Sequence, residues 1–127
     1  MEEHTSVLLS ELIAGLNIEP DKDYIDCTLG AGGHAMRVLE LSSPSGKVYG
    51  LDLDKKAINI AKKNLAEYAD RVVYINEDYS SIEDIVKEYN IDRKKLGGIY
   101  VDLGISSMQL KDKDKGFSFQ IDAPLNM

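Results

Sequence analysis

A glycine-rich segment at residues 30–34, with the sequence GAGGH, joins two stretches of opposite character. Residues 24–29 form a short apolar run that is typical of a buried strand and stops at the first glycine. Residues 35–41 then carry apolar side chains at helical spacing. Glycines at such a junction let the backbone turn tightly, and they leave room beside the first N–H groups of the helix. The segment therefore predicts a strand, a tight turn and a helix in succession.

The same alternation continues along the rest of the chain. Further strands are predicted at residues 48–53, 71–75 and 97–101, with helical spacing between them and in a leading helix at residues 7–16. Strands that alternate with helices indicate a parallel sheet covered on both faces. Because crossovers between parallel strands are right-handed, we expect a doubly wound, mostly parallel, Rossmann-like α/β sheet.

Three local signals refine this expectation. Asp54 can cap the helix that follows the second strand. Ser80 and Glu83 stand three residues apart and predict a capping box before the helix that follows the third strand. The single cysteine, Cys27, lies in the first apolar run without a neighbouring cation, so a small buried hydrophobe is a better interpretation than a nucleophile.

Length and charge limit the classes of protein to consider. A chain of 127 residues suits one domain, and its apolar runs are far shorter than the roughly 20 residues that cross a bilayer. The acidic N-terminus is unlike a signal peptide, so a cytoplasmic location is expected. A net charge of −7 argues against strong binding of nucleic acid by this segment alone. Two distant histidines and one cysteine predict no metal site.

The residues that follow the strands are the candidates for a ligand site, because ligands bind beyond the carboxyl ends of parallel strands. Asp52 ends the second strand, twenty residues after Gly32, where an acidic side chain accepts hydrogen bonds from ribose hydroxyls. Asp78 and Tyr79 follow the third strand, where they could bond and cover an adenine ring. Asp102 follows the fourth strand. A nucleotide-type cofactor is therefore predicted at this edge.

Two cofactor classes fit this layout. Gly30, Gly32 and Ala35 formally satisfy the dinucleotide fingerprint, so a nicotinamide-dependent oxidoreductase stays open. S-adenosylmethionine is favoured, since acidic residues such as Asp26 and Asp78 suit a sulfonium ligand better than a pyrophosphate. A plain turn without a ligand is the structural alternative.

Five segments with specific sequences occur in order along the chain. The segments are HTSVLL at residues 4–9, DCTLGAGGH at 26–34, DLD at 52–54, DLGISSMQL at 102–110 and KGFSF at 115–119. Together they resemble the bacterial 16S ribosomal RNA (cytosine-N4)-methyltransferases of the MraW/RsmH type. The glycine segment alone is weakly specific, whereas the DLGISS and GFSF sequences are highly specific.

The resemblance implies transfer of a methyl group from S-adenosylmethionine to N4 of a cytidine in the small ribosomal subunit. It implies that Asp102 orients the amine or takes its proton. Tyr79 stands where the family usually has phenylalanine, which is a tolerable change for a stacking face. By position, the implied cofactor contacts are Gly32, Gly33, His34, Asp52, Tyr79, Asp102 and Gln109.

The chain also departs from this family in length. Members are more than twice as long and carry an inserted helical domain and further strands, so residues 1–127 are expected to be the N-terminal, S-adenosylmethionine-binding half of the methyltransferase domain. A sheet truncated after the fourth strand would leave that strand at an edge, in the order 3-2-1-4. Unpaired apolar edges invite pairing with another chain, so self-association is predicted there. A cofactor-binding module without turnover is a further alternative.

Overall fold

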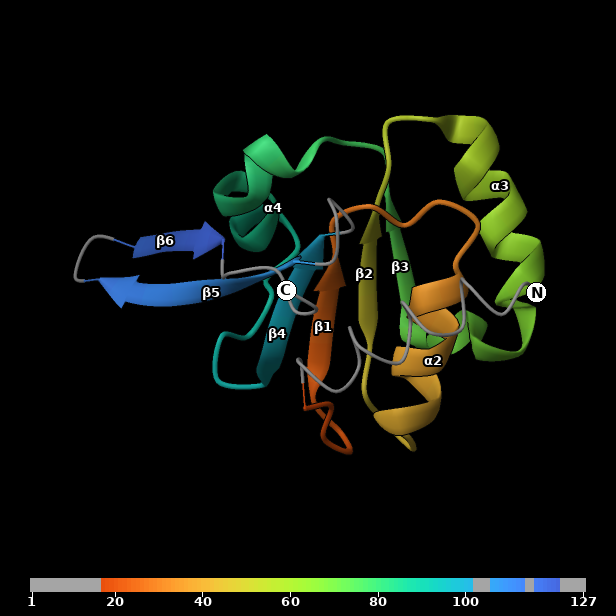
Figure 1. Cartoon of the computed structure of the whole chain (residues 1–127), viewed down its shortest axis with the longest axis horizontal. Helices are drawn as coiled ribbons and strands as arrows, with labels where there is room; N and C mark the ends of the chain where they lie inside the picture. Colours follow the sequence, from red (N-terminus) through yellow and green to blue (C-terminus); the bar gives the residue numbers. More distant parts are fainter. Residues whose placement is uncertain (1–16, 102–105, 114–115, 122–127) are drawn as a thin grey trace.

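The computed structural model describes residues 17–101 in full, together with the backbone of residues 106–113 and 116–121 (Figure 1). The helix predicted at residues 7–16 lies outside this part of the chain. None of the described helices combines the length and apolar character that crossing a membrane requires. In chain order the described elements are β1 (Asp23–Asp26), α2 (Gly33–Leu41), β2 (Val48–Leu51), α3 (Lys55–Asn64), the 3-10 helix η1 (Ala66–Arg71), β3 (Val72–Ile75), the 3-10 helix η2 (Tyr79–Ser81), α4 (Ile82–Glu88), β4 (Leu96–Val101), β5 (Ser106–Lys113) and β6 (Gly116–Ile121).

The strands form one sheet in the order β3-β2-β1-β4-β5-β6. The first four in this order pair in parallel, with β1 at the centre between β2 and β4. Each connection between these parallel strands passes through a helix, as the alternating sequence pattern requires. The predicted Rossmann-like α/β fold is therefore confirmed.

The sheet continues beyond β4 as an antiparallel hairpin. Residues 99–101 of β4 pair with residues 106–108 of β5, and β5 pairs in turn with β6 (Figure 1). The prediction that the fourth strand is an exposed edge is therefore wrong, because β5 takes up the side of β4 that faces away from β1. The structure therefore gives no support to the predicted self-association through this strand, because that prediction depended on an unpaired edge.

Helices cover the two faces of the parallel part of the sheet (Figure 1). Successive side chains of a strand point to opposite faces, and β1 accordingly sends Tyr24 to one core and Ile25 to the other. The core around Tyr24 contains the apolar residues of α2 and α3, and the core around Ile25 contains those of α4. The helical residues in these cores are Ala35, Val38, Leu39, Ile58 and Ala61 on the first face and Ile82, Ile85 and Val86 on the second.

The helix starts follow the capping signals in one case and not in the other. Asp54 caps α3 as predicted, since its carboxylate accepts the N–H of Lys56 at 2.8 Å. The capping box at Ser80 is wrong, because η2 comes first and α4 starts only at Ile82. The Ser80 hydroxyl instead donates to Asp78 Oδ2 at 2.9 Å.

Candidate functional site

The loops after β1, β2 and β3 leave the sheet at the same edge, because these strands run parallel (Figure 1). We call this edge the carboxyl-end edge and the opposite one the amino-end edge. The loops bring to it the glycine segment at residues 30–34, Asp52 and residues 76–79. Sheets of this kind bind their ligands there.

The glycine segment turns through two left-handed residues. Gly30 has φ +55° and Gly32 has φ +92°, a region that L side chains rarely adopt. A Cβ on Gly32 would also lie 3.0 Å from Leu65 Cδ1. For Gly33, the first residue of α2, no atom of residues 17–101 lies within 4 Å of the place where a Cβ would be. The start of α2 is therefore open to a ligand, and its backbone N–H groups favour negative charge.

Asp52 is hydrogen-bonded to the glycine segment across the carboxyl-end edge. Its Oδ2 accepts the N–H of Gly30 at 2.9 Å, and its Oδ1 accepts the N–H of Asp54 at 2.9 Å. The side chain is half-buried. Because an ionised carboxylate offers about four acceptor positions, each oxygen keeps capacity for a further donor.

Two asparagine side chains hold these loops in place. Asn76 Nδ2 donates to the carbonyls of Asp52 and Leu53 at 2.9 and 3.0 Å. Asn64 Nδ2, at the end of α3, donates to the carbonyl of Ala31 at 2.9 Å. Neither role was predicted; the only sequence signal for Asn76 is a polar residue directly after an apolar strand.

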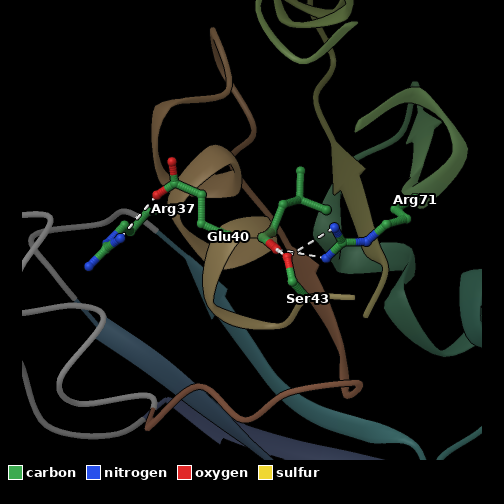
Figure 2. Close-up of polar contacts among 5 residues, drawn as sticks. Arg37, Glu40, Ser43 and Arg71 are labelled. Atoms are coloured by element: carbon green, nitrogen blue, oxygen red, sulfur yellow. Dashed lines mark hydrogen bonds and ion pairs between the residues drawn. The ribbon is translucent and has the colours of Figure 1, made fainter. Parts of the chain in front are cut away.

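A hollow of about 420 Å³ lies beside the glycine segment. Its lining is mostly apolar, and Arg37 and Glu40 of α2 contribute charge, with Nη1 and Oε1 3.0 Å apart (Figure 2). The two charges face one another and are both about half exposed, so they neutralise each other at this place. The residues lining the hollow are Ala31, Gly32, Gly33, Met36, Arg37, Glu40 and Asn64.

A buried polar contact connects β1 with β4 beneath the glycine segment. The Tyr100 hydroxyl donates to Asp26 Oδ2 at 2.9 Å, and both side chains are fully buried. Asp26 Oδ1 accepts the N–H of Thr28 at 3.0 Å. Burial, and then the Asp26 carboxylate, raises the pKa of Tyr100 well above its usual value. The His34 ring meets the Tyr100 ring edge-on, with centroids 6.4 Å apart. Asp26 and Tyr100 thus support the start of α2.

Cys27 lies next to this contact and is itself buried. Burial, followed by the charges of Asp26 and Asp78, raises the pKa of its thiol. The thiol therefore stays protonated and unreactive at neutral pH, which confirms its interpretation as a small buried hydrophobe. Across the described part of the chain, no three histidine, cysteine or acidic side chains are grouped so that they could hold a metal ion.

Comparison with known proteins places this geometry in a family. The sequence profile of the MraW methylase family matches residues 1–127. The chain belongs to the MraW methylase family. Ribosomal RNA small subunit methyltransferase H of Clostridium botulinum strain Hall is 47% identical over 124 residues, which are 98% of this chain and 39% of that protein. The chain thus spans about two fifths of the length of the curated relatives it matches.

Several solved structures resemble this chain in fold. A SAM-dependent O-methyltransferase from Thermotoga maritima has a TM-score of 0.55 at 14% identity, over 94% of this chain and 60% of its own. Aeropyrum pernix fibrillarin, crystallised with natively bound S-adenosyl-L-methionine, has a TM-score of 0.54 at 14% identity, over 67% of this chain and 35% of its own. Membership of a methylase family favours S-adenosylmethionine over the nicotinamide alternative.

The structure brings together some of the predicted site residues of this chain. Gly32, Gly33 and His34 form the turn into α2, and Asp52 bonds to the same loop through Gly30. Tyr79 begins η2 on the next loop, and its side chain is half-buried against the core under α4.

Two predicted residues are not brought into this group. Asp102 lies outside the described residues. The backbone of Gln109 lies in β5, three positions beyond Ser106, which pairs with Val101 at the carboxyl end of β4. Because β5 runs antiparallel to β4, these positions lead away from the carboxyl-end edge. The roles of Asp102 and Gln109 stay predictions.

Proposed function

We propose that this chain is the N-terminal, cofactor-binding part of an S-adenosylmethionine-dependent methyltransferase that acts on N4 of a cytidine in 16S ribosomal RNA. Residues 1–127 would form the S-adenosylmethionine-binding portion of the domain. The observation that carries the proposal is the hydrogen bond from Gly30 to Asp52 at the carboxyl-end edge, in a chain that belongs to a methylase family. It sets the open glycine turn and an acid with spare acceptor capacity side by side.

The described residues fit S-adenosylmethionine. The space beside Gly33 admits a ligand to the start of α2, where the backbone N–H of Gly33 suits the carboxylate of the methionine half. The N–H of Gly32 is already donated to the carbonyl of Leu29 at 3.0 Å and shapes the turn. The remaining acceptor positions of Asp52 suit the two ribose hydroxyls. Tyr79 is proposed to cover the adenine ring, and Gln109 to contact the cofactor. No positive side chain is required, since the adenosine half carries no phosphate.

The acceptor is a poor nucleophile, and this decides what the protein must supply. When bound, S-adenosylmethionine supplies an electrophilic methyl group on its sulfonium sulfur. The lone pair of cytidine N4 is delocalised into the ring, so oxygen acceptors on the N4 hydrogens would localise it and receive the proton that N4 loses. Asp102, two residues beyond Tyr100, is the proposed carboxylate. The cytidine must also leave its stack to reach such a site.

Calorimetric titration with S-adenosylmethionine and with NAD tests the cofactor assignment. We expect heat of binding with the first only. Asp52→Ala should weaken the affinity for S-adenosylmethionine at least about tenfold, since buried hydrogen bonds to a charged group contribute about 1.5–3 kcal/mol. Asp54→Ala removes the neighbouring carboxylate and serves as the matched control. Equal affinity of the Asp52 variant and the wild type would refute the ribose assignment.

Transfer of a tritiated methyl group to small-subunit particles tests turnover separately. Label on N4 of a cytidine supports the full proposal. Binding of S-adenosylmethionine without transfer would identify the chain as a cofactor-binding module, because positioning of the acceptor supplies most of the rate in a two-substrate reaction.

A further inference from the structure

The solvent face of α3 concentrates positive charge in an acidic chain. Lys55, Lys56, Lys62 and Lys63 are all exposed, and residues 55–66 contain no acidic side chain. None of the four lysines is ion-paired with another described residue. The four lysines carry a charge of +4, so the other residues of the chain sum to −11. The helix α3 is therefore a local concentration of positive charge in an acidic chain.

Helical geometry places the four lysines on one face. At about 100° per residue, they fall within an arc of about 120° that flanks the buried stripe on the Ile58 side. Lys62 is the nearest to that stripe, and its Nζ lies 5.5 Å from the centroid of the Tyr74 ring. Lys55 and Lys62 share one azimuth, and Lys56 and Lys63 share another. Each pair is separated by seven residues, or about 10.5 Å along the axis. We call these four residues the lysine face.

The lysine face lies next to the candidate site. α3 starts directly after the Asp52 loop, and Asn64 at its other end holds Ala31 of the glycine segment. Two large apolar side chains are exposed beside the lysines, with Leu53 69% and Ile60 50% accessible. A polyanion on the lysine face would therefore reach the carboxyl-end edge at Lys55 and Lys56, with apolar side chains available to its sugars and bases.

We propose that the lysine face is a docking surface for the sugar–phosphate backbone of the RNA substrate. The proposal rests on the function proposed above and adds where the RNA is held. Lysine contacts with phosphates supply affinity without reading sequence, and they orient the nucleic acid on the protein. A local concentration of positive charge on α3 also reconciles an acidic chain with an RNA substrate, since the charge near the contact, and not the net charge, determines the attraction.

The test compares two variants of equal net charge. K55Q/K56Q/K62Q/K63Q removes the lysine face, and K47Q/K87Q/K94Q/K95Q removes four lysines outside α3. Binding of the full chain to purified small-subunit ribosomal RNA is measured over a series of salt concentrations. We expect the first variant to bind at least about tenfold more weakly at low salt, with a salt slope shallower by about 3. The second variant should stay close to the wild type.

Parallel titrations with S-adenosylmethionine and with phosphatidylglycerol vesicles complete the test. The wild type and the two lysine variants should bind S-adenosylmethionine with equal affinity. Failure of the wild type to bind S-adenosylmethionine would refute the proposed function itself. The docking proposal is overturned if the wild type does not bind the RNA, or if both lysine variants lose the same affinity. It is also overturned if the lysine face binds anionic vesicles as tightly as RNA, since that would indicate a membrane surface.

Discussion

The two edges of the sheet differ in how closely their backbone is packed. At the amino-end edge, a Cβ on Gly46 would lie 2.4 Å from the carbonyl oxygen of Lys22, and one on Gly97 would lie 2.5 Å from the Tyr24 ring. At the carboxyl-end edge, a Cβ on Gly33 would have no described atom within 4 Å, and one on Gly32 would meet only the Leu65 side chain, at 3.0 Å. The glycines at the amino-end edge are therefore tightly enclosed, whereas Gly33 at the start of α2 is open among the described residues.

Polar contacts alone do not separate the two edges. Asp23 Oδ1 accepts the N–H of Lys47 at the amino-end edge, and Asp52 Oδ2 accepts that of Gly30 at the carboxyl-end edge, both at 2.9 Å. Asp23 is 4% exposed, however, whereas Asp52 is half-buried. A carboxylate that binds a neighbouring loop is thus a structural device at either edge. Open space beside it is what suits the carboxyl-end edge to a ligand.

Alanine in place of glycine should show the largest difference between the edges. Gly46→Ala should lower the free energy of unfolding by about 3 kcal/mol, because backbone atoms must shift to admit the methyl group. Gly33→Ala should keep or slightly raise it, since alanine favours the helix, while affinity for S-adenosylmethionine falls. Urea unfolding and calorimetry check the pair. Similar unfolding midpoints for both variants would contradict a closed amino-end edge.

Two arginines extend the same comparison (Figure 2). Arg71 donates to the carbonyls of Leu39 and Gly46 at 2.6 and 2.8 Å, which ties the end of α2 to the start of β2. Arg71→Ala should therefore destabilise the fold by about 2.5 kcal/mol, measured by urea unfolding. Arg37→Ala, the matched control, breaks only the exposed pair with Glu40 and should change stability by at most about 0.5 kcal/mol. Equal effects would show that Arg71 contributes no more than a surface charge.

Two buried tyrosines allow removal of one hydroxyl at each edge. Tyr100→Phe should cost about 2 kcal/mol, because the fully buried Asp26 loses a donor, and it should also weaken S-adenosylmethionine binding through the start of α2. Tyr24→Phe removes the acceptor of the Glu19 N–H and should cost about 1 kcal/mol without affecting the cofactor. Thermal unfolding and calorimetry check both. Unchanged cofactor affinity in Tyr100→Phe would separate Asp26 from the site.

The dependence of stability on alkaline pH is an independent test of the role of the Tyr100 hydroxyl. Burial raises its pKa above 10.0 in the folded chain, whereas the unfolded chain titrates near 10.0. The protonated Tyr100 hydroxyl therefore stabilises the folded chain fully below pH 10.0. This stabilisation is lost as the pH rises from 10.0 through the pKa that Tyr100 has in the folded chain. Above pH 10 the free energy of unfolding should fall less steeply in Tyr100→Phe than in the wild type.

Sequence patterns predicted the regular part of this molecule because those patterns are local. The alternation of strands and helices, the cap at Asp54 and the acid at residue 52 all follow from short-range spacing. The contact between Asp26 and Tyr100 joins residues that are 74 positions apart in the sequence, and no periodic pattern predicts it. The same holds for Asn64 and Asn76, whose amides bond to carbonyls that only the fold brings near.

The hairpin of β5 and β6 shows a different limit. Residues 106–113 have the sequence SSMQLKDK, which lacks the apolar alternation of a typical strand. Pairing with β4 defines this strand more than its own composition does. Because no strand was predicted after residue 101, the fourth strand was expected to be an edge, where the structure has β5 as a partner.

The smallest expected effect tests the two capping signals at the carboxyl-end edge. Asp54→Ala should cost about 1 kcal/mol, since the first turn of α3 loses an acceptor for the N–H of Lys56. Ser80→Ala should cost a few tenths of a kcal/mol, because it breaks only an exposed contact with Asp78. Urea unfolding of both variants checks this order. An equal loss of unfolding free energy in Ser80→Ala would show that the serine caps α4 in solution. The loop after β3 would then contribute more to stability than its hydrogen bonds in the structure indicate.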